Sequence, residues 1–343
     1  MLFYFQMETQ PFDNSTMMEL LEEEEPICIE STFLTMRVME NYLKSFEYFL
    51  LVSCFFSTFL QIYVLLKAVK YIKRGTGDEC LHVFLLSMTL GDLLLTCFCY
   101  PIEQLREQEI IKPPQWINIA QHFLTWVGLS ASSLSLICLN ADKLMYFKFP
   151  LRYANMVTSF KGVSLALFVW FGCIVFVTLC WWLECFTCEE DCRQLMILPN
   201  KVVMYIAFTV SACIAPSLTS LGVAIYILNV VTTHRSKLSD ENGNSSHALA
   251  TRLRTFYFIF MTTIFTVGTL LPYRIYNIQR QLTPRETGDI SCGSIIFSWT
   301  CLYLVSLNAI LNPIITVTVL PQYRFRWLCE KFGGGSSTTA VYV

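Results

Sequence analysis

Seven apolar stretches occupy most of this 343-residue chain: 46–72, 80–104, 116–141, 161–183, 200–231, 255–279 and 293–320. About 20 helical residues cross the hydrocarbon core of a bilayer. Lipid offers no hydrogen-bond partners to a backbone, so each stretch is expected to be helical. The sequence therefore predicts an all-α membrane protein with a seven-helix bundle over 46–320.

Composition agrees with a membrane protein, because only 15% of the residues are charged, against about 25% in soluble domains. The net charge of −2 gives no bias toward nucleic acid. The loops are too short for a soluble catalytic domain, and no His or Glu pair converges in the spans, so we do not expect an enzyme.

The distribution of Lys and Arg predicts the orientation. The chain has 24 Lys and Arg residues, and 15 of them lie in 67–79, 143–161, 233–254 and the C-terminal tail. These four segments are therefore predicted to face the cytoplasm. Residues 1–45, with the acidic run "ELLEEEEP", are then an extracellular tail at the plasma membrane. No basic region followed by an apolar core precedes that run, so we expect no cleaved signal peptide.

An ionisable residue inside a membrane span is a functional candidate, and Asp92 lies mid-span in "LSMTLGDLLLT". Asn308 and Asn312 in the last span share one helix face, and Pro313 frees a backbone carbonyl. If the two spans pack together, these residues form either a switch with two arrangements or a purely structural hydrogen-bond network.

In the sixth span, "TVGTLLPYRIYNI", Pro272 predicts a hinge. Arg274 follows two residues later. It either contacts an anionic ligand group, such as a peptide C-terminus, or extends to the membrane surface as an ordinary snorkelling side chain.

Six features recur in order along the seven spans: "LSMTLGD", "ADKLMYFKFPLRY", Trp170, Pro216, "TLLPY" and "LNPIIT". With the N-terminus outside, this order resembles a rhodopsin-like G-protein-coupled receptor over residues 46–331. The resemblance implies an extracellular ligand and a heterotrimeric G protein as partners. Asp92, as a buried ionisable residue, is expected to bind a cation or a proton, with sodium as the candidate ion, and no other cofactor is expected. The family's Asp-Arg-Tyr corresponds to Asp142-Lys143-Leu144, where the acid holds the cation until activation.

Several family positions differ here. The first-helix Asn corresponds to Gln61, the Trp before the sixth-helix proline is Leu270, and the tyrosine after Pro313 is Thr316. Lys143 lacks the bidentate fork of Arg, which predicts weaker locking and raised basal activity. Basic Arg252 and Arg254 replace the usual helix-six acid, so no ionic lock between helices three and six is expected.

Cysteines also depart from the family pattern. Asn118 stands where the family has the helix-three cysteine of its disulfide, whereas "CWWLECFTCEEDC" holds four cysteines in the second outer loop. Outside conditions favour disulfides, but spacing does not give their connectivity. Cys180 and Cys99 lie in the same outer region, and a metal site at C-x-x-C is a minor alternative. The disulfide candidates are Cys28, Cys185, Cys188, Cys192 and Cys292.

The resemblance also limits the ligand. Thr125 replaces the acid of amine receptors, and 293–320 has no retinal-binding Lys. Acidic residues crowd the outer face, which favours a cationic, neuropeptide-type ligand, although the Glu run can also be a solvated tail. The ligand-binding candidates are Glu103, Arg106, Thr125, Glu184, Tyr273 and Arg274.

The termini carry predicted modifications. Residues 321–331 predict an amphipathic cytoplasmic helix along the lipid, with Cys329 as a palmitoylation site. The flexible tail 332–343 offers Ser and Thr residues whose phosphorylation would recruit arrestin. Asn14 in "NST" is an outside glycosylation site.

Two alternatives stay open beside a G-protein-coupled receptor. A ligand-blind or chemosensory seven-span receptor is compatible with the changed switch residues. A small transporter or channel is the other, although no internal repeat supports it.

Overall fold

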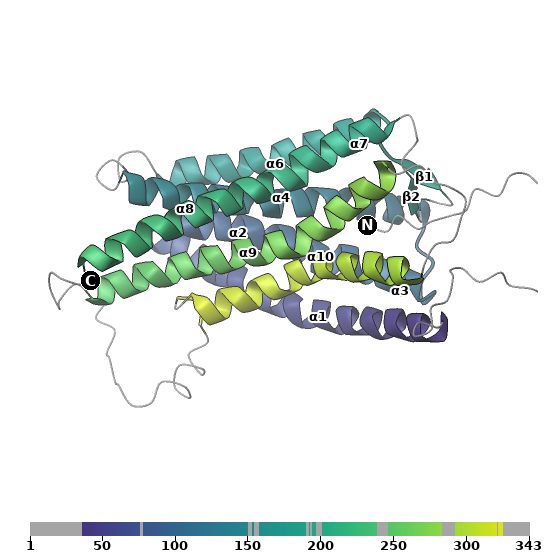
Figure 1. Ribbon diagram of the computed structural model, residues 1–343, viewed down its shortest axis with the longest axis horizontal. Helices are drawn as coiled ribbons and strands as arrows, with labels where there is room; N and C mark the ends of the chain where they lie inside the picture. Colours follow the sequence, from purple (N-terminus) through teal and green to yellow (C-terminus); the bar gives the residue numbers. More distant parts are fainter. Residues whose placement is uncertain are drawn as a thin grey trace, which may run out of the picture.

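The computed structural model describes residues 36–75, 78–149, 153, 158–189, 192, 194–196, 201–238, 246–282, 292–320 and 322–324 (Figure 1). Within them, seven helical segments are long and apolar enough to cross a membrane, and each coincides with one predicted stretch. The all-α seven-helix fold predicted from the sequence is therefore confirmed.

The first three spans are formed by α1 (Met36–Arg74), a composite of α2, η1 and α3, and α4 (Gln115–Lys148). The composite consists of α2 (Glu79–Leu94), the π-helix η1 (Leu95–Cys99) and α3 (Tyr100–Glu107). The fourth span is α6 (Ser159–Trp182), and the antiparallel hairpin of β1 (Thr187–Glu189) and β2 (Gln194–Met196) follows it.

The fifth span joins α7 (Val202–Thr209), the π-helix η3 (Val210–Ile214) and α8 (Ala215–Leu238). The last two are α9 (Ser246–Leu282) and α10 (Cys292–Val319). Helices α9 and α10 continue through Pro272 and Pro313.

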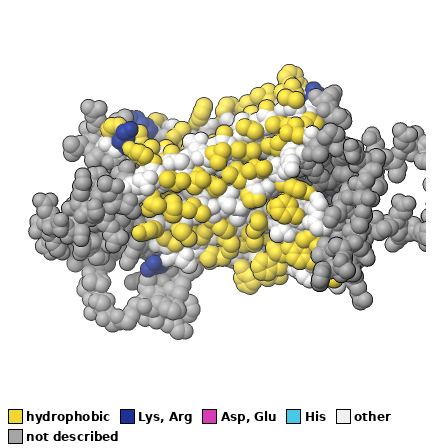
Figure 2. Space-filling model, viewed as in Figure 1, with side chains coloured by type: hydrophobic (Ala, Val, Ile, Leu, Met, Phe, Trp, Pro, Cys, Tyr) yellow, Lys and Arg dark blue, Asp and Glu magenta, His cyan; other side chains and the backbone are white. Residues whose placement is uncertain are grey.

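Helices α2 and α4 pack extensively on each other and are the most buried spans, whereas α1 and α6 are the least buried. In Figure 1, α1 and α10 lie on one side of the bundle, and α6 and α8 lie on the other. In Figure 2, apolar side chains cover the visible middle of the bundle, and Lys and Arg appear only toward its ends. This surface fits a surrounding bilayer.

The first helix begins earlier than predicted. We placed residues up to 45 in the N-terminal tail, but α1 starts at Met36. Tyr42 hydrogen-bonds Thr300 at 3.0 Å, and the Phe46 ring stacks on Tyr303 with centroids 4.3 Å apart. These contacts with α10 extend the helix beyond the apolar stretch, because packing adds stability that hydropathy does not report.

We refer to the end that carries β1 and β2 as the hairpin end, and to the opposite end, where α4 finishes, as the Lys143 end.

Candidate functional site

A close crossing of α2 and α4 positions the centre of the bundle. A Cβ added to Gly91 would lie 2.9 Å from the carbonyl oxygen of Gly128, so only glycine permits this approach. Asp92 follows Gly91 directly, and Ser132 lies one turn beyond Gly128. The crossing therefore brings the carboxylate of Asp92 to Ser132.

Asp92 joins three helices in the bundle interior. The residue is 1% exposed. Ser132 Oγ donates to its Oδ1 at 2.8 Å, and Asn312 Nδ2 on α10 donates to its Oδ2 at 2.8 Å. The second and last spans thus pack with Asp92 and Asn312 facing each other.

Asn308 extends this network to α9. Its Nδ2 donates to Thr266 Oγ1 at 3.1 Å and to Thr269 Oγ1 at 3.0 Å. Its Oδ1 lies 3.4 Å from Asn312 Nδ2. We call Asp92, Ser132, Asn308, Asn312, Thr266 and Thr269 the central polar network. It links α2, α4, α9 and α10, so a shift of α9 would act on Asp92.

Gln61 on α1 compensates for Pro313. Proline has no N–H to donate to the carbonyl four residues earlier, which is that of Ala309. Gln61 Nε2 donates to this carbonyl at 2.9 Å, and Gln61 Oε1 accepts from Thr96 in η1 at 2.7 Å. The carbonyl freed by Pro313 is therefore bound by a side chain from α1.

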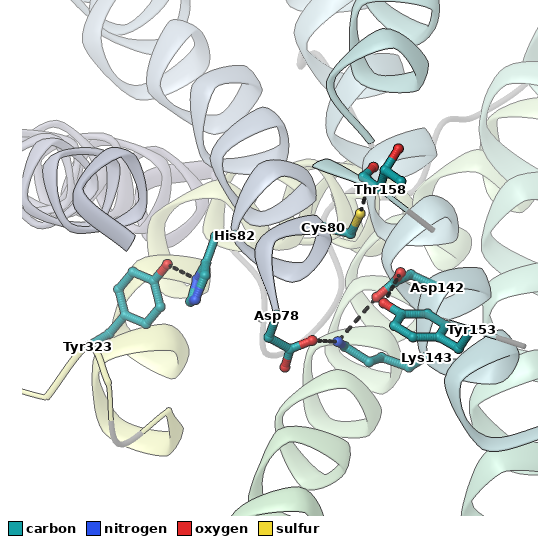
Figure 3. Close-up of polar contacts among 8 residues, drawn as sticks. All are labelled: Asp78, Cys80, His82, Asp142, Lys143, Tyr153, Thr158 and Tyr323. Atoms are coloured by element: carbon teal, nitrogen blue, oxygen red, sulfur yellow. Dashed lines mark hydrogen bonds and ion pairs between the residues drawn. The ribbon is translucent and has the colours of Figure 1, made fainter. Parts of the chain in front are cut away.

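Lys143 is held by two carboxylates at its own end of the bundle (Figure 3). Its Nζ lies 2.6 Å from Asp78 Oδ1 and 3.1 Å from Asp142 Oδ2, and the residue is only 2% exposed. Tyr153 donates to Asp142 Oδ1 at 2.7 Å. Burial, and then the charge of Asp142, raise the pKa of the Tyr153 hydroxyl, so it stays protonated and remains a donor.

His82 and Tyr323 form a second contact near this end (Figure 3). His82 Nδ1 lies 2.8 Å from Tyr323 Oη, and the imidazole stacks on Tyr71 with centroids 4.9 Å apart. Burial raises the pKa of the Tyr323 hydroxyl, so the hydroxyl stays protonated, and the tautomer of His82 sets which of the two groups donates. Tyr71 Oη in turn donates to the Gln322 carbonyl at 2.9 Å. The chain after α10 is thereby attached to α1 and α2.

A buried guanidinium lies toward the hairpin end. Arg274 on α9 is 1% exposed. Its guanidinium carbon is 4.8 Å from the Trp126 ring centroid and 5.6 Å from that of Tyr273. The Tyr205 side chain hydrogen-bonds Arg274 and also accepts from Asn277 at 3.0 Å. Arg274 therefore points into the bundle and does not extend to the membrane surface.

A second buried arginine lies on α3. Arg106 Nη1 donates to Asn118 Oδ1 at 3.2 Å and to Gln121 Oε1 at 3.4 Å, and its Nε is 3.6 Å from Glu107. Glu103 is buried beside Arg106. Both arginines thus contact the half of α4 nearer the hairpin.

The same region holds buried polar atoms with no hydrogen-bond partner among the described residues. They are Tyr100 Oη, Gln104 Oε1, Gln121 Nε2, His122 Nδ1, Trp126 Nε1 and Tyr303 Oη. A buried polar atom without a partner costs about 1–3 kcal/mol. The hydrogen-bonding capacity of these six atoms is therefore unused among the described residues.

The hairpin is attached to α4 by His122, whose Nε2 lies 3.2 Å from the carbonyl oxygen of Cys192. Cys188 and Cys192 form a disulfide within the hairpin. Asn118, at the position of the family's helix-three cysteine, accepts from Arg106 instead.

Comparison with known proteins agrees with this architecture. The family model described as 7 transmembrane receptor (rhodopsin family) matches residues 62–315. This chain belongs to that family. The receptor is also similar to the G-protein coupled receptor aex-2 of Caenorhabditis elegans, with 26% identity over 302 residues, which are 85% of this chain and 86% of the relative. It is a multi-pass membrane protein of a receptor family, not of an enzyme family.

Most of the ligand-binding candidates lie near one another in the receptor. Glu103, Arg106, Tyr273 and Arg274 are buried toward the hairpin end. Thr125 is also buried there, but its hydroxyl donates to the Gln121 carbonyl at 2.7 Å. Glu184 does not join them, because it is exposed in the turn after α6.

The remaining predictions divide by position. Among the disulfide candidates, Cys188 and Cys192 are bonded to each other, and Cys185 is buried as a free thiol. Several predictions lie outside the described residues: Asn14, Cys28, Cys329, the segment 325–331 and the tail. The side chains of Arg252, Arg254 and Cys292 are not described either. No group of three or more His, Cys, Asp or Glu suited to a metal occurs among the described residues.

Sequence reasoning missed Asp78, Tyr153 and the pair His82 and Tyr323. Asp78 immediately precedes the second span, and Tyr153 ends the quoted "FPLRY" segment. Neither residue has a pattern that identifies its partner. The sequence signal that points to Asp78 is the placement of Lys143 at the edge of an apolar span, because a buried cation needs a carboxylate partner.

Proposed function

We propose that the receptor transduces an extracellular ligand to a heterotrimeric G protein at the plasma membrane, with its N-terminus outside. The family and the named relative support this function. The central polar network supports it as well, because it connects α9 with α2, α4 and α10 through hydrogen bonds that can rearrange.

Two features support the orientation. Disulfides persist in oxidising compartments, and Cys188–Cys192 lies at the hairpin end, where α1 also begins (Figure 1). Most of the Lys and Arg residues lie in segments at the other end, as cytoplasmic loops require.

The ligand that fits best is a peptide with an anionic end, such as a free C-terminal carboxylate. The single observation that carries this choice is the burial of Arg274 against the Trp126 ring. A guanidinium binds a carboxylate through two parallel hydrogen bonds. The unpartnered polar atoms on α3, α4 and α10 are suited to peptide groups. Acidic residues of the outer face would steer a basic peptide.

A sodium ion fits the central polar network. The oxygens available are those of Asp92, Ser132 and Asn308, and the buried Asn312 Oδ1 has no hydrogen-bond partner among the described residues. Hard cations prefer an all-oxygen set of this kind. The sodium ion would neutralise the negative charge of the buried Asp92 carboxylate in the resting receptor.

The test screens matched peptides that end in a free acid or an amide, in cells expressing the receptor with each Gα family. Active peptides are expected to require the free acid. Arg274→Gln is expected to weaken an active peptide by about 1.5–3 kcal/mol, roughly 10- to 150-fold in potency. Arg274→Lys should recover part of this loss, because it restores charge without the planar fork.

Lys112→Gln is the matched control, since this exposed lysine precedes α4 in the sequence. Equal potency of acid and amide forms would reject the anionic end. Signalling with no dependence on any added peptide would favour the ligand-blind receptor, and ion flux without Gα would favour a channel. Glycosylation of Asn14, palmitoylation of Cys329 and arrestin binding by the tail are further parts of this proposal.

A further inference from the structure

Two cysteines outside the hairpin disulfide meet at the end of α6. Cys180 lies in the last turn of the helix, and Cys185 follows the turn after it. Both are buried, at 6% and 2% exposure, and neither is bonded to another cysteine. Their side chains are nevertheless within hydrogen-bonding contact of each other.

The backbone explains this contact. The N–H of Cys185 donates to the Cys180 carbonyl at 3.0 Å, and that of Glu184 donates to the Trp181 carbonyl at 3.0 Å. Glu184 has a φ of 54°, in the left-handed region. These are the features of a Schellman motif, which folds the chain back across the last turn of a helix. The motif commonly brings the residues at these two positions into side-chain contact.

The location of the pair determines its chemistry. Cys180 and Cys185 belong to the same apolar cluster as Cys192, which is disulfide-bonded to Cys188. A compartment that preserves that disulfide would also oxidise two neighbouring thiols.

We propose that Cys180 and Cys185 form a second disulfide in the mature receptor. Both S–H bonds break and one S–S bond forms, by exchange with a disulfide of a thiol oxidoreductase in the secretory compartment. That disulfide accepts two electrons and two protons and becomes two thiols. The proposal rests on the orientation given above, with the hairpin end outside.

The new bond would fix the hairpin relative to the bundle. It closes a ring over residues 180–185, directly before Phe186. The Phe186 ring packs on Trp126 with centroids 5.4 Å apart, and Arg274 packs against the same tryptophan. The disulfide would thereby hold Phe186 in place beside the residues proposed to bind the ligand. It would take over part of the anchoring that the family obtains from its helix-three disulfide.

Differential alkylation of the full-length receptor tests the pair without any ligand. Surface receptor is denatured with N-ethylmaleimide, reduced, labelled with iodoacetamide and analysed by mass spectrometry. Cys180 and Cys185 are expected to carry the second label, as Cys188 and Cys192 do. The membrane thiols Cys54 and Cys213 should carry the first label.

Unreduced digests identify the partner. Cleavage after Glu184 and Phe186 places Cys180, Cys185 and Cys188 on three different peptides. A linked pair containing Cys180 and Cys185 is expected, and Cys180→Ser should move Cys185 to the first label while Cys188 and Cys192 stay bonded.

Two results would overturn the proposed Cys180–Cys185 disulfide but not the orientation. In the first, Cys180 and Cys185 of wild type carry the first label while Cys188 and Cys192 are oxidised. In the second, Cys185 is linked to a cysteine other than Cys180. The first label on all four cysteines would overturn the orientation as well. The two failures are therefore distinguishable.

Discussion

Lys143 Nζ lies 2.6 Å from Asp78 Oδ1, so the cation at the end of α4 is bound by the residue that precedes α2 as well as by its neighbour Asp142. The resemblance led us to expect only the neighbouring acid. Asp78 makes this an interaction between two helices, and relative movement of α2 and α4 at this end would break it.

Asp78→Asn is expected to raise ligand-independent signalling. The side chain of Asp78 is 37% exposed, so the loss is limited to about 1 kcal/mol, or about fivefold in the ratio of active to inactive receptor. Basal second-messenger level per surface receptor measures it. Glu79→Gln is the control, because Glu79 is adjacent to Asp78 but does not pair with Lys143, which is bound by Asp78 and Asp142. An equal rise in both variants would rule out a specific role for Asp78.

Lys143→Arg is expected to lower basal signalling. A guanidinium can bind Asp142 and Asp78 with several donors at once, whereas an ammonium acts as a point charge. The same basal assay compares wild type with the variant at matched surface levels. Indistinguishable basal signalling would count against a weakened lock in wild type.

Tyr323→Phe is expected to loosen the chain after α10. The change removes the hydroxyl from His82 Nδ1 and leaves a buried ring nitrogen without its hydrogen-bond partner, at a cost of about 1–3 kcal/mol. Hydrogen exchange of residues 319–324 should become faster. Tyr63→Phe serves for comparison, since the Tyr63 hydroxyl contacts the Arg324 carbonyl at a longer 3.5 Å and should matter less. Unchanged exchange in Tyr323→Phe would contradict the attachment.

Gly91→Ala is expected to destabilise the receptor by about 1–3 kcal/mol, because the new methyl group would meet the Gly128 carbonyl and Ser132 Cβ. The melting temperature in detergent reports the loss. Gly172→Ala provides a matched control, since a Cβ at Gly172 meets nothing within 4 Å. There the higher helix propensity of alanine should leave stability unchanged or slightly increased. Equal melting of the two variants would contradict the close crossing.

Asp92→Asn is expected to abolish stabilisation by sodium. Wild-type receptor should melt at a higher temperature in sodium chloride than in potassium chloride at equal ionic strength, because an ion that binds only the folded state stabilises it. Ser132→Ala should reduce this difference partly. A sodium effect that persists in Asp92→Asn would place the ion elsewhere.

The sequence by itself determined the seven spans and the helical class, because hydropathy and backbone hydrogen bonding are local requirements of lipid. It also singled out Asp92 and Asn312, since an ionisable or amide side chain in an apolar stretch is conspicuous. Its agreement with family motifs led to the correct family.

Only the tertiary structure decided which of these residues meet. Asp92 reaches Ser132 because Gly91 and Gly128 let α2 and α4 approach closely, and Gln61 reaches the carbonyl freed by Pro313 because α1 packs on α10. Asp78 meets Lys143 across a sequence separation of 65 residues and Tyr153 meets Asp142 across 11, and sequence spacing encodes neither contact. Such contacts depend on the register between helices, which packing of whole surfaces sets and no local pattern specifies.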